Sequence, residues 1–382
     1  MRPQVPLMLL VARKNLLHER TRLAISVGGV ALSVFLIGIL LSLYRGWDQK
    51  VGEYVEEVPA DLWVASEGAT DFIQAASLLP GSLGTQLDLL PEVETVSPLI
   101  VRPLQLAKEG GDRDTKFDVQ LVGYDPSLTL GGPLAVVAGK SPPGPGEVVI
   151  DKAMSDRFDI DIGDRLVRGT DALTVVGKSA GGDFVFTQVA FVTLDTAADF
   201  LQLDPPSQRT FFLLTLNDPK EKEAVSKRLE ASTPGVIFVN GKEFADETRE
   251  RLLGNILPML VAVLFVAFIV GLAVAGLTIY TATVEKSREY GILKAEGFTN
   301  RFLYRVVLEQ SLVTSILGFV IGVGLTVFAA PFAQDLVPQF VVFVRWQDIL
   351  GITGATLLMA LLAAYIPVRR LAKIDPVTVF KG

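Results

Sequence analysis

The stretch LLGNILPMLVAVLFVAFIVGLAVAGLTIYTATV, residues 252–284, contains no charged side chain. Written as one helix that rises about 1.5 Å per residue, it would measure roughly 50 Å, well beyond the ~30 Å hydrocarbon core of a bilayer. The stretch therefore predicts a membrane-spanning helix of which part stands outside the bilayer. We expect the segment 246–253 to extend this helix through Asn255 and Pro258 into one continuous rod.

Three further windows lack charge, and each is about as long as a membrane span requires. They are Leu23–Tyr44, Gln310–Gln334 and Ile349–Val368. The first is too long for the apolar part of a signal peptide, and SLYR at 42–45 offers no small-residue cleavage pattern, so we interpret it as an uncleaved signal anchor. The overall composition, 50% hydrophobic and 20% charged with a net charge of −7, therefore hides four membrane-spanning helices.

Lys and Arg residues mark the cytoplasmic flanks, because positive residues resist translocation. The segments 1–22, 285–309 and 369–382 are rich in them, whereas the short outer loop 335–348 has Arg345 alone. This bias predicts a multi-pass protein of the cell's inner or plasma membrane, with both termini in the cytoplasm. The positive residues counted are Arg2, Arg13, Lys14, Arg20, Arg22, Lys286, Arg288, Lys294, Arg301, Arg305, Arg369, Arg370, Lys373 and Lys381.

The block 45–251 is then extracytoplasmic and long enough to bury a core of its own. Its pattern predicts a large mixed α/β domain of two lobes, with a break near the SPPGPG stretch at 141–146 and a later return of the chain to the first lobe. With the rod as a lever between this domain and the cytoplasmic loop, movement would pass along the second span; a long tilted span is the alternative. Strands are expected at 61–64, 117–122, 147–150 and 173–176, and helices at 71–79, 152–158 and 219–232.

Several classes of chemistry are excluded or disfavoured by composition. The chain has no cysteine and one histidine, His18, so disulfides, thiolate metal sites and paired-histidine sites are excluded. The segment Gly139-Lys140-Ser141 resembles the end of a phosphate-binding loop, but Leu134 stands where its first glycine belongs and prolines follow. The aspartates at 156, 159, 161 and 164 lack the closing Glu of a calcium loop. We expect no catalytic, cofactor or metal residues.

Small residues and one acidic side chain stand out in the third span. Gly318, Gly322 and Gly324 form a face that allows close helix packing. Glu309 lies near the cytoplasmic start of this span, where an ionisable group usually reaches water, although handling of protons or cargo is the alternative. No other ionisable group lies at depth in the windows, which disfavours a proton-coupled carrier.

The loop between the second and third spans reads VEKSREYGILKAEGF at 284–298. It predicts a short, densely charged amphipathic helix with Ile292 and Leu293 on an apolar face, and an anchor for lipid head groups is the simplest interpretation. The loop is also very similar to the V-x-E-R-x-x-E-I-G-I-L-[KR]-A-x-G loop of ABC-transporter permeases of the MacB, LolC/LolE and FtsX group. Lys286 replaces the usual arginine and Tyr290 the usual aliphatic residue.

The resemblance extends along nearly the whole chain. Residues 12–17 and 20–23 resemble the amphipathic entry helix of this type VII, mechanotransmission family. Segments 61–64, 123–126, 145–151 and 162–164 resemble its MacB-like periplasmic core domain. The tail from Pro367 to Val377 resembles the family ending P-x-R-R-A-x-x-x-x-P-x-x-A-L-R, with Val379 and Phe380 in place of Ala-Leu.

The resemblance implies a permease subunit without ATPase motifs, which is not itself an enzyme. ATP and Mg would be bound by two copies of a separate ABC ATPase, and a second permease copy would complete a homodimer or heterodimer in the lipid bilayer; a membrane-fusion protein is a further partner, and no nucleic acid is implied. The ATPase-coupling residues would be Glu285, Lys286, Arg288, Glu289, Tyr290, Gly291, Ile292, Leu293, Lys294, Ala295 and Gly297.

Family members differ in what they act on. The external block of about 205 residues is smaller than expected for a MacB-type drug exporter and larger than for an FtsX regulator. We therefore expect ATP-driven export or extraction of an amphiphilic, membrane-partitioned cargo such as a lipid, lipoprotein, haem, peptide or drug. The alternative is an FtsX-like regulator that activates an extracytoplasmic partner protein without transport; a membrane-anchored enzyme is disfavoured because no nucleophile–base pair or metal cluster is visible.

The expected boundaries follow from these segments. They are an entry helix at 1–22, spans at 23–44, 252–284, 310–334 and 349–368, the external domain at 45–251, the coupling loop at 285–309, the outer loop at 335–348 and the tail at 369–382.

Overall fold

The computed structural model describes residues 20–69, 71–73, 77–111, 116–128, 130–185, 187–203, 207–336, 343 and 345–372. Its contacts divide the chain into a helical unit, residues 1–46 and 257–382, and an α/β unit, residues 47–256. The expected entry-helix stretch 12–17, His18 and the tail from Lys373 lie outside the described residues.

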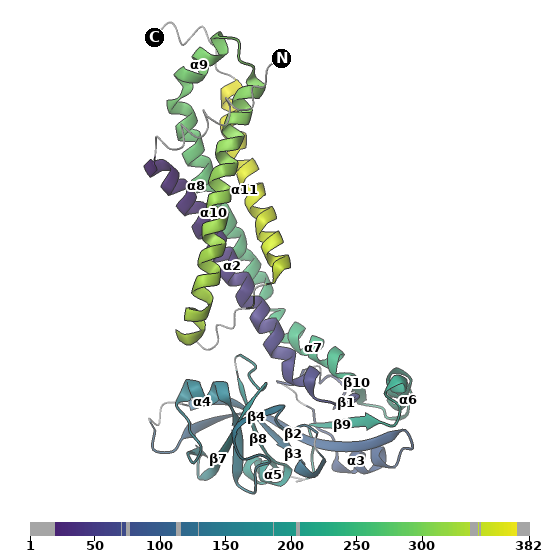
Figure 1. Ribbon diagram of the computed structural model, residues 1–382. Coiled ribbons are helices and arrows are strands. Elements are labelled where there is room, and N and C mark those ends of the chain that lie inside the picture. Colours follow the sequence, from purple (N-terminus) through teal and green to yellow (C-terminus); the bar gives the residue numbers. More distant parts are fainter. Residues whose placement is uncertain are drawn as a thin grey trace. The chain divides into compact units, whose positions relative to one another are not determined.

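Four long helices carry the apolar windows (Figure 1). They are α2 (Arg20–Glu57), α8 (Leu257–Glu285), α10 (Asn300–Leu336) and α11 (Trp346–Ala372), and each is long and apolar enough to cross a membrane. The short helix α9 (Ser287–Ala295) lies between α8 and α10. The expected fold class, four membrane-spanning helices with a mixed α/β domain, is confirmed.

The helices extend beyond the uncharged windows. Helix α2 continues without a break past Arg45 to Glu57, and α10 begins at Asn300, so the second half of the expected loop 285–309 is helical. The expected rod through 246–284 is wrong, because α7 (Gly241–Leu253) ends at a turn of residues 254–256 before α8 begins. Pro258 has no N–H to donate to the carbonyl of Gly254, and its ring would collide with that carbonyl in a continuous helix.

The α/β unit is built on one ten-stranded mixed sheet. The strand order is β10-β1-β9-β2-β3-β8-β5-β7-β4, with β6 paired to β2 and β7; β3–β8 and β5–β7 are parallel and the other pairs antiparallel. The strands are β1 (Leu62–Ser66), β2 (Val93–Lys108), β3 (Lys116–Tyr124), β4 (Ala135–Gly139), β5 (Glu147–Asp151), β6 (Arg165–Arg168), β7 (Asp171–Ala180), β8 (Gln188–Thr193), β9 (Phe211–Leu216) and β10 (Val236–Val239).

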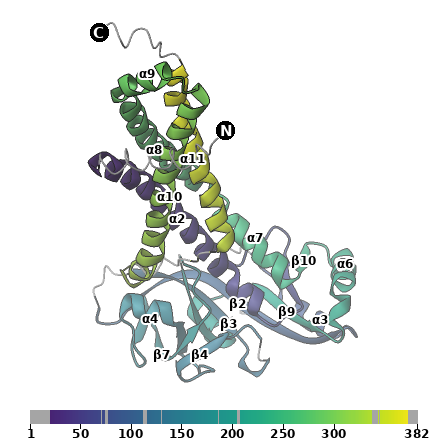
Figure 2. The same ribbon diagram turned by 45° about the horizontal axis from the view of Figure 1, so that its top comes forward.

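Alternating side chains place hydrophobic cores on both faces of this sheet. On one face, α3 (Gly81–Asp88) and α6 (Lys222–Ser232) cover β1, β9 and β10, while α4 (Lys152–Phe158) and α5 (Leu194–Leu201) cover β3, β5 and β8. These two cores correspond to the two expected lobes, and the chain returns to the first through β9 (Figure 2). The 141–146 stretch is not the break between them, because it joins β4 to β5 within the second.

An aromatic core on the opposite face joins both lobes. It packs the end of α2 and helix α7 against the sheet, and its largest side chains are Tyr54, Trp63, Phe72, Phe184, Phe191, Phe211 and Phe244. The Tyr54 hydroxyl donates a hydrogen bond of 2.6 Å to the Gly131 carbonyl. The end of α2 is thereby fixed within the α/β unit.

The four expected strands and the helices at 152–158 and 219–232 are present, the latter with a 3-10 turn, Pro219–Glu221, as its start. The expected helix at 71–79 is wrong in its described parts, 71–73 and 77–79. Its backbone bonds elsewhere: the Phe72 N–H donates to Thr248 Oγ1 at 3.2 Å, and Leu79 exchanges two bonds with Arg209. The aromatic core therefore overrides the local helical pattern.

Candidate functional site

Helix α9 is fixed to the helical unit by its inner face. Tyr290 and Gly291 are buried, and Tyr290 shares a core with residues of the first turns of α10. The neighbouring α10 residues are Phe302, Leu303, Val306 and Val307. This core, to which α2, α8 and α11 also contribute, joins α9 to the start of α10.

The end of α9 is shaped by Gly297, which has a φ of +94°. The Phe298 N–H donates to the Leu293 carbonyl and the Gly297 N–H to the Lys294 carbonyl, each at 3.0 Å. This pair of bonds is a Schellman motif, which favours glycine at the left-handed position. The Phe298 ring lies against the Phe302 ring in a tilted arrangement, with centroids 4.8 Å apart, so the turn connects α9 tightly to α10.

The outer face of α9 is exposed and mixed in character. It presents Arg288, Glu289, Ile292, Ala295 and Glu296, and the Ile292 side chain is 42% exposed. The expectation that Ile292 and Leu293 share an apolar face is wrong, because consecutive helical residues point about 100° apart and only Leu293 packs on the core. An exposed isoleucine between charges gives this face both an apolar and an ionic means of contact.

The remaining expected coupling residues flank this face. Lys286 and Lys294 are half-buried, and Glu285 is exposed at the end of α8. Arg22, from the start of α2, donates through Nη2 to both Glu285 carboxylate oxygens at 2.8 Å. An exposed ion pair contributes about 0–1 kcal/mol, so it orients the start of α2 beside the end of α8 rather than holding the fold together.

A second ion pair joins α2 to α11 at the opposite end of the helical unit. Arg45 Nε lies 3.3 Å from Asp348 Oδ1, and the Asp348 side chain is 8% exposed. The Phe343 N–H also donates to the Ser42 carbonyl at 3.1 Å. Helix α2 is thus paired with α8 at one end and with α11 at the other.

Gly318 and Gly322 mark the closest approach of α10 to α2. An added Cβ at Gly318 would lie 2.6 Å from Val30 Cγ1, and one at Gly322 would lie 2.6 Å from Val34 Cβ and 2.7 Å from the Ala31 carbonyl oxygen. Gly324, which we expected to share this packing face, does not, because no described atom lies within 4 Å of the corresponding position. It lies two residues, about 200°, around the helix from Gly322.

Gly322→Ala is expected to destabilise the helical unit by about 1–3 kcal/mol, because its methyl group would meet backbone that cannot move aside. Gly324→Ala is the matched control in the same helix and should be neutral or slightly stabilising. Thermal unfolding of the detergent-solubilised chain measures both. Equal effects of the two substitutions would show that the α2–α10 approach is not constrained.

The sequence did not identify the α2 side of these contacts. Gly29 and Gly38 are also at close approaches, since an added Cβ would lie 2.3 Å from Val274 Cγ1 and 2.6 Å from Thr326 Oγ1, respectively. The small residues of the first window were the signal that was missed. Glu309 is half-buried, and its Oε2 has no hydrogen-bond partner among the described residues.

Comparison with known proteins matches most of the chain. The family model of the FtsX-like permease C-terminal region matches residues 259–376, and that of the MacB-like periplasmic core domain matches residues 23–232, more than half of the chain. The chain belongs to the ABC transporter permeases of the MacB and FtsX type. This permease is a membrane protein whose α/β unit is the MacB-like core domain.

One reported relative of this permease is similar in sequence along nearly the whole chain, and two others are similar along less than half of it. An uncharacterized ABC transporter permease of Mycobacterium bovis is 24% identical over 98% of this chain and 100% of its own. One from Methanocaldococcus jannaschii is 23% identical over 45% of this chain and 46% of its own. The macrolide export ATP-binding/permease protein MacB 2 of Aeromonas hydrophila is 26% identical over 45% of this chain and 28% of its own.

Two solved structures are similar to part of the permease. The periplasmic region of MacB from Actinobacillus actinomycetemcomitans is 13% identical, with a TM-score of 0.37, over 51% of this chain and 95% of that one. The extracellular domain of the ABC-type transporter YknZ from Gram-positive bacteria is 11% identical, with a TM-score of 0.36, over 47% of this chain and 98% of that one.

Proposed function

We propose that this permease is the membrane subunit of an ATP-driven exporter or extractor that acts on an amphiphilic, membrane-partitioned cargo. The observation that carries the proposal is the exposed face of α9, with Glu289 and Ile292 at its centre, on a helix held firmly by its buried face. A separate ABC ATPase in two copies would bind ATP and Mg and contact this face. A second permease copy would complete the complex.

The coupling residues suggest a route for movement. Closure of the ATPase on ATP would push α9 and, through the shared core, α10. The Arg22–Glu285 pair would pass the displacement to α2, which is helical through to its anchored end at Tyr54. The α7–α8 connection contains a turn, so we assign transmission to α2 instead of the second span. This route is mechanotransmission: movement, not cargo, passes through the membrane.

The positive flanks support a cytoplasmic placement of α9 and both termini in the inner or plasma membrane, with the α/β unit outside. Near-absence of charge in the spans supports an amphiphilic cargo, because a hydrophilic one would require polar groups along its path. The macrolide exporter among the relatives points the same way. Cargo would then be taken up at the outer face by the α/β unit.

The test uses the full-length permease co-expressed with a separate ABC ATPase from the same organism. We expect the two to co-purify and the permease to stimulate ATP hydrolysis in lipid nanodiscs. A variant in which residues 47–256 are deleted should keep membrane insertion and ATPase binding but lose cellular resistance to, or export of, amphiphilic compounds. Retained export would contradict a role for the α/β unit. Absence of export by the full-length permease, together with an external protein bound at equal stoichiometry, would favour the regulator.

A further inference from the structure

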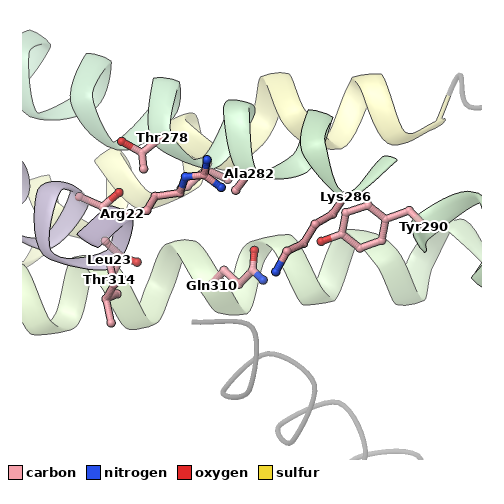
Figure 3. A pocket seen from close by; sticks show the side chains of 10 residues that line it. Arg22, Leu23, Thr278, Ala282, Lys286, Tyr290, Gln310 and Thr314 are labelled. Carbon is pink, nitrogen blue, oxygen red and sulfur yellow. The ribbon is translucent and has the colours of Figure 1, made fainter. Parts of the chain in front are cut away.

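A small polar cavity lies inside the helical unit beside α9 (Figure 3). Its volume of about 50 Å³ leaves room for several water-sized groups. Four helices contribute to its walls, and Lys286 enters from the junction between α8 and α9. The side chains that define its chemistry are Arg22, Lys286, Tyr290 and Gln310.

Hydrogen-bond donors dominate this cavity. It is lined by a guanidinium, an ammonium, a phenol hydroxyl and an amide, and no acidic residue is among the described residues in its lining. Figure 3 shows the Lys286 and Tyr290 side chains both directed toward Gln310. Arg22 bonds both carboxylate oxygens of Glu285 through Nη2. Donors grouped in this way suit an anionic oxygen group such as a phosphate.

The cavity also lies where a lipid head group would be. Leu23 and Ile279 form part of its wall, and both belong to apolar windows that end within a few residues of it. Arg22 and Glu285 mark the points at which charge begins again. A membrane-spanning protein meets the phosphates of the bilayer at this transition from apolar to charged residues.

We propose that this cavity binds the phosphate group of an anionic phospholipid from the leaflet on the α9 side of the membrane. Lys286 and Arg22 would supply charge, and Tyr290 and Gln310 neutral donors. Because Tyr290 also packs α9 onto α10, an occupied cavity would hold α9 more rigidly. This last consequence rests on the proposed coupling function, whereas lipid binding itself does not.

The experiment counts lipids that remain bound to the full-length permease in detergent by native mass spectrometry. The chain is titrated separately with phosphatidylglycerol, with zwitterionic phosphatidylcholine and with inorganic phosphate. We expect one tight phosphatidylglycerol site per chain, weakened about tenfold or more in Lys286→Gln, because one charge-assisted bond is lost. Arg288→Gln removes an equal charge from the exposed face of α9, outside the cavity, and should bind as the wild type does.

A second variant tests the cavity independently, in case Lys286→Gln fails to fold. Gln310→Glu introduces negative charge into the cavity and should also abolish the tight site, with the melting temperature in lipid-free detergent as the check on folding. Equal loss in Lys286→Gln and Arg288→Gln would overturn the proposal in favour of diffuse surface charge. Phosphatidylcholine binding as tight as phosphatidylglycerol would overturn selection for an anionic lipid, and inorganic phosphate competing equally would overturn a lipid source. Persistence of ATPase co-purification in Lys286→Gln would separate this result from a failure of the coupling function.

Discussion

Ile292→Asp is expected to reduce permease-stimulated ATP hydrolysis about tenfold or more while the permease still inserts and folds. Ile292 is 42% exposed in the isolated chain, so the substitution leaves no buried charge in the fold, but it places an unpaired charge in any surface that covers α9. Burying an isoleucine contributes about 1.5–3 kcal/mol, which corresponds to this loss. Stimulated hydrolysis in nanodiscs and co-purification of the ATPase measure the effect.

Glu289→Lys should act in the same direction by reversing a charge on the same face. Leu89→Asp is the matched control, since Leu89 is even more exposed but lies in the α/β unit, and it should leave stimulation unchanged. If Ile292→Asp and Glu289→Lys both retained normal stimulation and co-purification, α9 would not be the ATPase contact.

The stability of the α/β unit is expected to rise as the pH falls from 7.5 to 5, through Asp151. Burial raises the pKa of this carboxyl from 3.8 to about 6, despite hydrogen bonds that it accepts from the Ala153 and Gly182 N–H groups. Because the pKa of Asp151 is higher in the folded than in the unfolded chain, its protonation contributes to the free energy of unfolding. This contribution is complete below the unfolded-state pKa of 3.8 and is lost as the pH rises through about 6. The expected gain over this interval is about 1 kcal/mol.

Urea unfolding of the full chain, followed by tryptophan fluorescence, to which the buried Trp63 contributes, measures this dependence. Asp151→Asn should remove this part of the pH dependence whatever its effect on stability at one pH. Asp156→Asn, an exposed aspartate on α4, should keep the dependence of the wild type. An unchanged slope in Asp151→Asn would show that another group titrates.

The sequence predicted those parts of the fold that obey a single strong constraint. Bilayer thickness requires long uncharged windows, and four were found; glycine and proline bounded strands such as 147–150. It failed where distant parts decide the outcome. In the region 71–79, the Phe72 N–H donates to the Thr248 hydroxyl and Leu79 exchanges two backbone bonds with Arg209. Gly318 faces α2, whereas Gly324 does not. In the candidate site the motif located α9, but Arg22, 263 residues from its partner Glu285, required the structure.

Within the helical unit, helix α2 is held at three places, by an ion pair toward each end and by close packing near its middle. Its two ion pairs, at Arg22 and Arg45, are roughly 35 Å apart along the helix, and its closest backbone contacts, at Val30 to Val34, fall near the midpoint. Sliding α2 along its axis would lengthen both ion pairs at once. Tilting α2 about its contacts with Gly318 and Gly322 would instead keep these contacts and move the two ends of α2 in opposite directions. We therefore expect a small sideways displacement of α2 at Arg22 to be accompanied by a displacement in the opposite direction at Arg45.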